Sequence, residues 1–170
     1  MIFPIITKRL KITEFNINMA ESVHMSSLDE DNMRFLPDEV FNTVEEAKET
    51  IELLISFYRL NNKPLVFPVL LHTGQHIGHV QAVPISNGWE VGYHIFKPYT
   101  KNGYATEAVT AFLPYITKKL GIDKIYGICS ADNISSRKVL EKCGFILEYE
   151  GLGFLHEHEQ QIGRYIREFH

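Results

Sequence analysis

The chain is poor in the residues that would hold a fold together covalently or through a metal. Its 170 residues include only two cysteines, Cys129 and Cys143, and these are not at metal-ligand spacing. Neither a disulfide framework nor a cysteine metal site is indicated, and a reducing intracellular compartment accounts for both thiols. We expect each cysteine to be a small buried apolar side chain.

Excess positive charge and long apolar runs are also missing. Lysine and arginine number 17 against 21 acidic residues, a formal net charge of −4, so no basic field favours nucleic acid. No window approaches the roughly 18 consecutive apolar residues of a membrane-spanning helix. The apolar run at residues 1–6 is too short for the core of a signal peptide. We expect a cytoplasmic protein that binds neither nucleic acid nor a membrane.

What remains is an ordinary globular composition. The chain is 45% hydrophobic and 22% charged, and a chain of this length buries roughly 70% of the surface that its unfolded form exposes. No internal repeat, linker or low-complexity tract interrupts it. The sequence therefore predicts a single domain over residues 1–170.

The hydrophobic periodicity changes several times along the chain. Apolar residues at helical spacing predict helices at residues 20–28, 44–58, 105–119 and 134–142. Alternating or β-branched runs predict strands at residues 9–15, 66–71, 77–83, 89–96, 124–129, 145–151 and 161–169. This order indicates a mixed α/β (α+β) sheet with crossover helices. Alternation also predicts that His72, His76 and His79 are exposed.

Residues 100–105 (Thr-Lys-Asn-Gly-Tyr-Ala) lie between a predicted strand and a predicted helix. The start of a helix presents backbone N–H groups without intrahelical partners, together with partial positive charge, and so favours an anion. Gly103 and Ala105 keep this wall small enough for close approach, and Lys101 adds a mobile positive charge. Alternatively, the turn merely begins the helix. A second signal, residues 133–145, makes an acyl-CoA-dependent transferase the better interpretation.

These segments resemble the GCN5-related N-acetyltransferase (GNAT) superfamily, and within it the RimJ/RimL-like ribosomal-protein acetyltransferases. The resemblance covers nearly the whole chain, although Thr100 stands where the superfamily often has glutamine or arginine. It is carried by residues 7–10 (Thr-Lys-Arg-Leu), 28–37, 90–93 (Glu-Val-Gly-Tyr), 102–108 (Asn-Gly-Tyr-Ala-Thr-Glu-Ala) and 133–145.

The resemblance implies a GNAT fold: a mostly antiparallel sheet of about seven strands, splayed between the fourth and fifth, with about four helices. It implies acetyl-CoA as co-substrate and no metal. Backbone groups of His94 and Ile95 would contact pantetheine, and Asn133 would contact the co-substrate from the other side, unless Asn133 is only a helix cap. The pyrophosphate would be wrapped by Lys101, Asn102, Gly103, Tyr104, Ala105 and Thr106.

The implied reaction moves an acetyl group to a primary amine by direct attack in a ternary complex. The resemblance makes Glu90 the general base, through a water; the other interpretation is a solvent-facing carboxylate. Many members place a tyrosine acid where this chain has Leu140. Ser136 is then the candidate hydrogen-bond donor to the leaving thiolate, unless it only caps the helix, and Tyr149 could replace it if its strand returns to the cleft.

The acceptor stays open between a protein N-terminus and a small-molecule amine. Asp29, Glu30 and Asp31 lie in the segment that forms the acceptor wall in the family; they either attract a cationic amine or form a solvated face. A homodimer is possible by resemblance. A catalytically inactive CoA-binding sensor or interaction module is the alternative function. A nicotinamide-dependent oxidoreductase is disfavoured, because no Gly-x-Gly-x-x-Gly follows an N-terminal strand.

Overall fold

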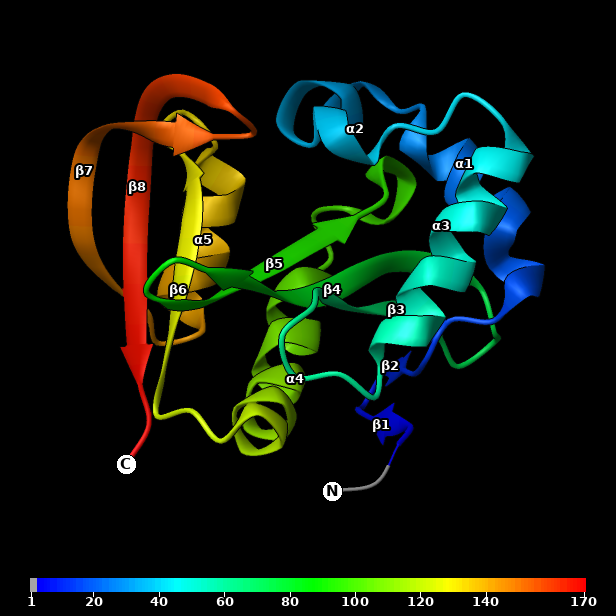
Figure 1. The fold of residues 1–170 in the computed structure, drawn as a ribbon, viewed down its shortest axis with the longest axis horizontal. Helices are drawn as coiled ribbons and strands as arrows, with labels where there is room; N and C mark the ends of the chain where they lie inside the picture. The colour runs from blue at the N-terminus through cyan, green and yellow to red at the C-terminus, as the bar shows by residue number, and fades with distance from the viewer. Residues whose placement is uncertain (1–2) are drawn as a thin grey trace.

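A single sheet organises the chain in the computed structural model, which describes residues 3–170 (Figure 1). Within this range the sheet has eight strands in the order β1-β2-β3-β4-β5-β6-β8-β7. Their bounds are β1 Ile5–Ile6, β2 Leu10–Ile12, β3 Leu65–Leu71, β4 His76–Ile85, β5 Gly88–Ile95, β6 Lys124–Ser130, β7 Ile146–Leu155 and β8 His158–Glu168. The mixed, mostly antiparallel sheet predicted from the sequence is confirmed.

One junction of the sheet differs from all the others. Every neighbouring pair is antiparallel except β5 and β6, which run parallel and share a single register pair, Glu90 with Tyr126. Beyond that pair the two strands separate, and Figure 1 shows β5 diverging from β6. The expected splay between the fourth and fifth strands lies here, because β1 adds one strand to the predicted count.

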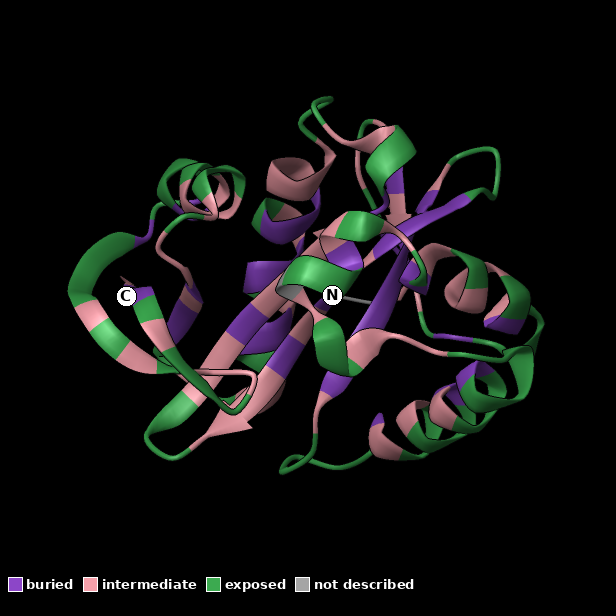
Figure 2. Cartoon of the chain, turned by 90° about the horizontal axis from the view of Figure 1, so that it is seen from above, coloured by how far each residue is buried: buried purple, intermediate pink, exposed green. Residues whose placement is uncertain are grey.

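Helices cover both faces of the sheet. The described α-helices are α1 Ala20–Ser27, α2 Glu30–Phe35, α3 Val44–Phe57, α4 Tyr104–Leu120 and α5 Ile134–Lys142, with 3₁₀ turns η1 Ile17–Met19, η2 Pro37–Glu39 and η3 Lys97–Tyr99. Phe112 and Ile116 of α4 pack in the main core against strand residues that include Phe67 and Val91. A smaller core joins α1, α3 and β3 through Ala20, Ile51 and Val66. The buried strand centres are visible in Figure 2.

Local chemistry explains where the helices begin and end. The Thr43 hydroxyl accepts a hydrogen bond from the Glu46 N–H, and the Asn133 side chain accepts one from the Ser136 N–H, so both residues are N-caps. Gly121 ends α4 in the left-handed region, at φ 65°. α4 runs unbroken through Pro114. None of the helices in residues 3–170 has the length and apolarity needed to cross a bilayer.

The histidines of β4 correct one sequence prediction. His76 is only 6% exposed, and the side chain of His79 is only 14% exposed. Both were expected on an open face, but β4 is covered on both faces, by α4 on one and by the α1–η2 region on the other. Only His72 lies exposed, as predicted.

Candidate active-site cleft

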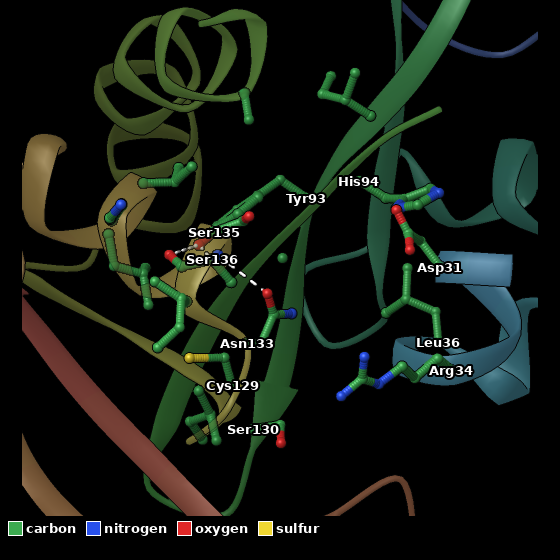
Figure 3. Close-up of a pocket in the computed structure, with 18 of the residues that line it drawn as sticks. Asp31, Arg34, Leu36, Tyr93, His94, Cys129, Ser130, Asn133, Ser135 and Ser136 are labelled. Carbon is green, nitrogen blue, oxygen red and sulfur yellow. Dashed lines mark hydrogen bonds between the residues drawn. The ribbon is translucent and has the colours of Figure 1, made fainter. Parts of the chain in front are cut away.

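The separation of β5 from β6 opens a cleft of about 1150 Å³. Its walls come from α2 and η2, from strands β4, β5 and β6, from the starts of α4 and α5, and from the β7–β8 turn with the start of β8. Figure 3 shows side chains from α2, β5, β6 and α5 around one space, with Tyr93 and Ser136 on one side and His94, Asp31 and Arg34 on the other. Segments far apart in the sequence therefore share a single cavity.

Alternation along β5 divides this cleft into two sides. Successive strand residues point to opposite faces, so Glu90 and His94 share one face while Tyr93 and Ile95 share the other. The contacts agree: the Tyr93 hydroxyl contacts Ser136 of α5, whereas His94 Nε2 lies 3.8 Å from Asp29 Oδ2 before α2. The α5 side and the α2 side of the cleft are thus separated by the thickness of one strand.

Glu90 stands where the two sides meet. It belongs to the only β5–β6 register pair and lines the cleft. Burial raises the pKa of its carboxyl from 4.5 to about 7. No hydrogen bond from any residue in the described range 3–170 satisfies this carboxylate. A mostly buried, unpaired carboxylate with a pKa near neutrality can accept a proton at physiological pH.

The start of α4 forms the wall beside the β5 edge. Gly103 is the N-cap at φ 79° and no side chain caps the helix. Within residues 3–170, no acceptor meets the backbone N–H groups of Tyr104, Ala105 and Thr106, and all three residues line the cleft. These donors and the helix dipole make this wall suitable for an anionic group.

An arginine to which the sequence analysis assigned no role, Arg9, holds this turn in place. Arg9 Nε donates to Glu107 Oε2 at 2.6 Å and its Nη1 donates to the Asn102 carbonyl at 2.8 Å. Its guanidinium lies 4.5 Å from the centroid of the Tyr104 ring. Burial acts to raise the pKa of Glu107, but hydrogen bonds from Thr7 and Arg9 lower it below its ordinary value. The start of β2 is therefore tied to the first turn of α4.

A second hydrogen-bonded group lies at the start of α5. The Tyr93 hydroxyl lies 2.8 Å from the Ser136 carbonyl oxygen and 2.9 Å from Ser136 Oγ. Cys129 lies beside them with its side chain in the cleft lining. Burial raises the pKa of its thiol, as expected for a small apolar side chain.

Contacts of carboxylates with histidine and arginine side chains bridge the α2 side of the cleft. His79 Nε2 lies 3.2 Å from Glu39 Oε2, and Arg34 of α2 reaches Asp132 before α5 at 3.3 Å. The tip of the β7–β8 hairpin points toward α2 in Figure 1, where His156 Nδ1 lies 3.2 Å from Asp38 Oδ2. Burial acts to raise the pKa of Glu39, but the neighbouring His79 lowers it below its ordinary value. This side of the cleft therefore keeps a carboxylate at neutral pH.

The acetyltransferase (GNAT) domain family matches residues 9–146. The chain belongs to the GNAT acetyltransferase family. The uncharacterized N-acetyltransferase YnaD of Bacillus subtilis is 33% identical over 144 residues, which cover 82% of this chain and 81% of YnaD. The crystal structure of a GNAT-family acetyltransferase from Bacillus anthracis superposes with a TM-score of 0.80 at 26% identity, covering 98% of both chains.

RimL, a ribosomal L7/L12 alpha-N-protein acetyltransferase in complex with coenzyme A, has a TM-score of 0.82 to this chain. The superposition covers 99% of this chain and 98% of RimL, and the sequence identity of 17% shows a likeness of fold alone. Both the family and its N-acetyltransferase class, inferred from the sequence, are confirmed.

The fold brings nearly all the residues predicted for this acetyltransferase into one cleft. Asn102 is the exception, since its side chain donates to the carbonyls of Tyr99 and Thr100 and stabilises the turn. The predicted residues that line the cleft are Glu90, His94, Ile95, Lys101, Gly103, Tyr104, Ala105, Thr106, Asn133 and Ser136.

Tyr149 does not return to the cleft. It lies on β7, the outermost strand next to β8, and its hydroxyl donates to the Leu152 carbonyl at 2.7 Å. It is 39% exposed and absent from the cleft lining. The condition for its role as proton donor is therefore not met.

His156 lies in the turn between β7 and β8, and His158 is the first residue of β8. Within residues 3–170, no group of three histidine, cysteine, aspartate or glutamate side chains is arranged to hold a metal ion.

Proposed function

We propose that this acetyltransferase moves an acetyl group from acetyl-CoA to a primary amine by direct attack in a ternary complex. The observation that carries the proposal is the position of Glu90. Its carboxylate, whose pKa is raised by burial to about 7, lies where β5 and β6 separate. It faces the α2 side of the cleft, opposite the side that holds Tyr93 and Ser136. A base for the amine and a donor for the sulfur would thus lie on opposite sides of one strand.

The start of α4 suits the pyrophosphate of the co-substrate. Three backbone N–H groups without acceptors and a glycine without Cβ form the wall that a diphosphate requires. Lys101, at φ 64°, brings a positive charge to the same turn. In the proposal the residues of this turn bind the diphosphate chiefly through their backbone, and Asn102 acts by shaping the turn.

The open edge of β5 suits the pantetheine arm. The Phe96 N–H donates to the Ile77 carbonyl. From the pair Gly78–Ile95 to the pair Ile85–Gly88, the register between β4 and β5 has no shift. Peptide groups alternate in an antiparallel ladder, so those of Tyr93 and Ile95 point away from β4, while those of His94 point toward it. We therefore propose that pantetheine forms hydrogen bonds with the backbone of Tyr93 and Ile95, and that the backbone of His94 does not take part.

Glu90 would accept the proton that the amine must lose. At pH 7 an α-amine with a pKa near 7.8 is about 14% neutral, whereas a lysine-type amine is only about 0.04% neutral. A base with a pKa of about 7 is half ionised at that pH, so it can remove the proton directly or through a water. The carboxylates of Asp31 and Glu39 on the same side of the cleft favour a cationic acceptor before it loses its proton.

The thioester of bound acetyl-CoA supplies an activated acetyl group. Ser136 and Tyr93 would hold a hydroxyl proton near the sulfur that departs. A serine hydroxyl is too weak an acid to protonate a thiolate outright, so Ser136 would act as a hydrogen-bond donor. Asn133 orients it by capping the helix that carries it.

Incubation with acetyl-CoA and a mixed panel of amines tests the proposal. Free thiol release should depend on the amine, and mass spectrometry should find products heavier by one acetyl group. Initial rates should fit a ternary-complex scheme, with no acetylated enzyme when the amine is omitted. CoA binding without turnover across the whole panel would instead identify a binding module.

A further inference from the structure

A second cavity lies behind the α2 side of the cleft. It has a volume of about 260 Å³ and lies between α1, α3 and the sheet. Its walls are mostly apolar and include Phe15, Val23, Ile51, Leu54, Val66 and Phe96. Glu39, His79 and Gln81 line both this cavity and the main cleft, so the two spaces meet at these residues.

We infer that this side cavity binds a large apolar group of the acceptor, an aliphatic or aromatic side chain carried next to the reactive amine. This inference rests on the proposed function, which leaves the class of acceptor open, and it names that class. The occupant is the acceptor itself, because Gln81 and His79, which line both spaces, pair with β5 residues on the same face of the sheet as Glu90.

The strand register sets the distance between the base and the cavity mouth. Gln81 pairs with Gly92, and Gly92 is the next residue after Glu90 on that face of β5. Residues two apart in a strand are roughly 7 Å apart, a span that an amine with a long side chain can cross. A Cβ at Gly92 would stand 2.6 Å from Gln81 Nε2, so the Gln81 side chain lies over the glycine. The absence of a side chain at Gly92 gives Gln81 its place at the mouth.

Two of the buried polar side chains that line the side cavity, Asn32 and His76, already have hydrogen-bond partners within the protein. Asn32 Nδ2 donates to the carbonyls of Ser27 and Glu39, and the two ring nitrogens of His76 contact Ser22 Oγ and the Gly78 carbonyl at 2.9 Å. Burial, followed by the charge of His79, lowers the pKa of His76 to about 4, so its ring is neutral at pH 7. A polar ligand group would lose water there without gaining these partners, whereas an apolar group loses nothing. The cavity is therefore suited to hydrocarbon.

The size of the cavity and the charge at its mouth narrow the class of acceptor further. Its volume far exceeds the roughly 30 Å³ that one water occupies in the liquid, which leaves room for a leucine-like or phenylalanine-like group. The Glu39 carboxylate contacts His79 at the mouth. It would repel an acceptor with an acidic side chain.

Four peptides that differ only in their first residue test the inference on the wild-type enzyme. N-terminal leucine or phenylalanine should give a kcat/KM roughly 10-fold to 100-fold above that of N-terminal alanine. N-terminal glutamate should fall below alanine. Equal kcat/KM values for all the peptides would overturn the side-cavity assignment and leave the acetyltransferase proposal standing. No acetylation of any peptide or amine, with CoA still bound, would overturn the proposed function itself.

Filling the cavity provides the second test. Thr50 lines it from α3 and is half-buried, so Thr50→Phe should reduce the leucine and phenylalanine peptides to the level of alanine. The alanine rate and the acetyl-CoA KM should stay within about twofold, as expected when only one pocket is lost. The matched control is Glu49→Phe, which adds the same ring at an exposed position of the same helix. It should leave the preference unchanged.

Val23→Phe enters the same cavity from α1 and carries the same expectation. Circular dichroism of each variant shows whether it is folded, and the kinetics are interpreted on a folded one. An undiminished preference for apolar acceptors in either folded variant would place their binding elsewhere.

Discussion

The hydroxyl of Tyr93 lies within hydrogen-bond distance of both the carbonyl oxygen and the hydroxyl of Ser136, at 2.8 and 2.9 Å. A carbonyl can only accept, so when Tyr93 donates to it, the contact between the two hydroxyls is a hydrogen bond only if Ser136 donates its proton to the tyrosine oxygen. When Tyr93 instead donates to Ser136 Oγ, the serine proton becomes available to another acceptor. The pair thus has two proton arrangements, and only the second offers a proton to the cleft.

We expect Ser136→Ala and Tyr93→Phe each to lower kcat, because each removes one part of this arrangement. A hydrogen bond to a charged group is worth about 1.5–3 kcal/mol, so loss of the serine donor should cost roughly 10-fold to 100-fold in kcat. In the Ser136→Ala background, Tyr93→Phe should have little further effect. A double-mutant cycle of kcat measures this coupling.

Ser135→Ala is the matched control for that cycle. Ser135 lines the same cleft, and its hydroxyl makes no hydrogen bond to a residue in the described range. Its removal should leave kcat within about twofold. Additive effects of the Tyr93 and Ser136 substitutions would show that the two hydroxyls act independently.

Glu90→Gln should lower kcat roughly 10²-fold to 10⁴-fold at neutral pH while CoA binds normally. The wild-type rate should fall as pH decreases through about 7, because protonation removes the base. This inflection should vanish in the glutamine variant. An unchanged rate, or an unchanged pH profile, would remove Glu90 from the mechanism.

The same substitution has a separate consequence for stability. A carboxyl whose pKa is raised in the folded state is penalised as pH rises from its unfolded value of 4.5 to its folded value of about 7. Glu90→Gln should therefore stabilise the unliganded protein above pH 7, by on the order of 1–3 kcal/mol. Its effect should shrink toward zero below pH 4.5. Denaturant unfolding at pH 8 and pH 5 would show this difference.

Gly103→Val should weaken acetyl-CoA binding for two reasons. Gly103 has φ 79°, where a branched residue is strained, and its Cβ would stand in the wall at 3.4 Å from Arg9 Nη2. We expect the Kd for CoA, measured by calorimetry, to rise at least about 10-fold. Gly121→Val at the other end of α4 is the matched control, since it has φ 65° and open space around its Cβ. Both variants should lose roughly 1–2 kcal/mol of stability, but only Gly103→Val should lose affinity.

The helix at α5 shows how far the sequence could predict this fold. The predicted range, residues 134–142, agrees with the structure because a capping asparagine and a following glycine mark its two ends. The helix α2 was not predicted separately, since six residues are too few to show a helical period. The strand β1, at two residues, carries no pattern at all. Local signals therefore predicted the long elements, missed α2 and β1, and placed the three-residue β2 within a longer strand at residues 9–15.

The site residues divide in the same way. Gly103 and Glu90 lie within local motifs and could be selected from the sequence. The bonds from Tyr93 to Ser136 and from Arg9 to Glu107 join residues 43 and 98 positions apart, so no local pattern links them. Burial of His79 was missed for a related reason: period-two alternation separates the two faces of a strand but does not tell that helices cover both.

His94 should make the protein sensitive to acid. Its side chain is 11% exposed, and its Nε2 has no hydrogen-bond partner in the described residues. Burial, followed by the charge of His79, lowers its pKa from 6.5 to about 4, although Asp29 and Glu39 act to raise it. Below pH 6.5 the unfolded chain binds a proton that the folded protein does not, so the stability from this residue is lost as pH falls from 6.5 to 4.

We therefore expect His94→Leu to flatten the dependence of the unfolding free energy on pH. The variant should be similar to wild type in stability at pH 7.5, because the neutral ring already lacks a partner for Nε2. At pH 4.5 it should be more stable by on the order of 1–3 kcal/mol, since leucine has no proton to accept. Denaturant titrations at both pH values measure this, with His72→Leu, at an exposed position, as the control. Parallel pH curves for wild type and His94→Leu would show that the ring titrates alike in the folded and unfolded states, which its burial against His79 argues against.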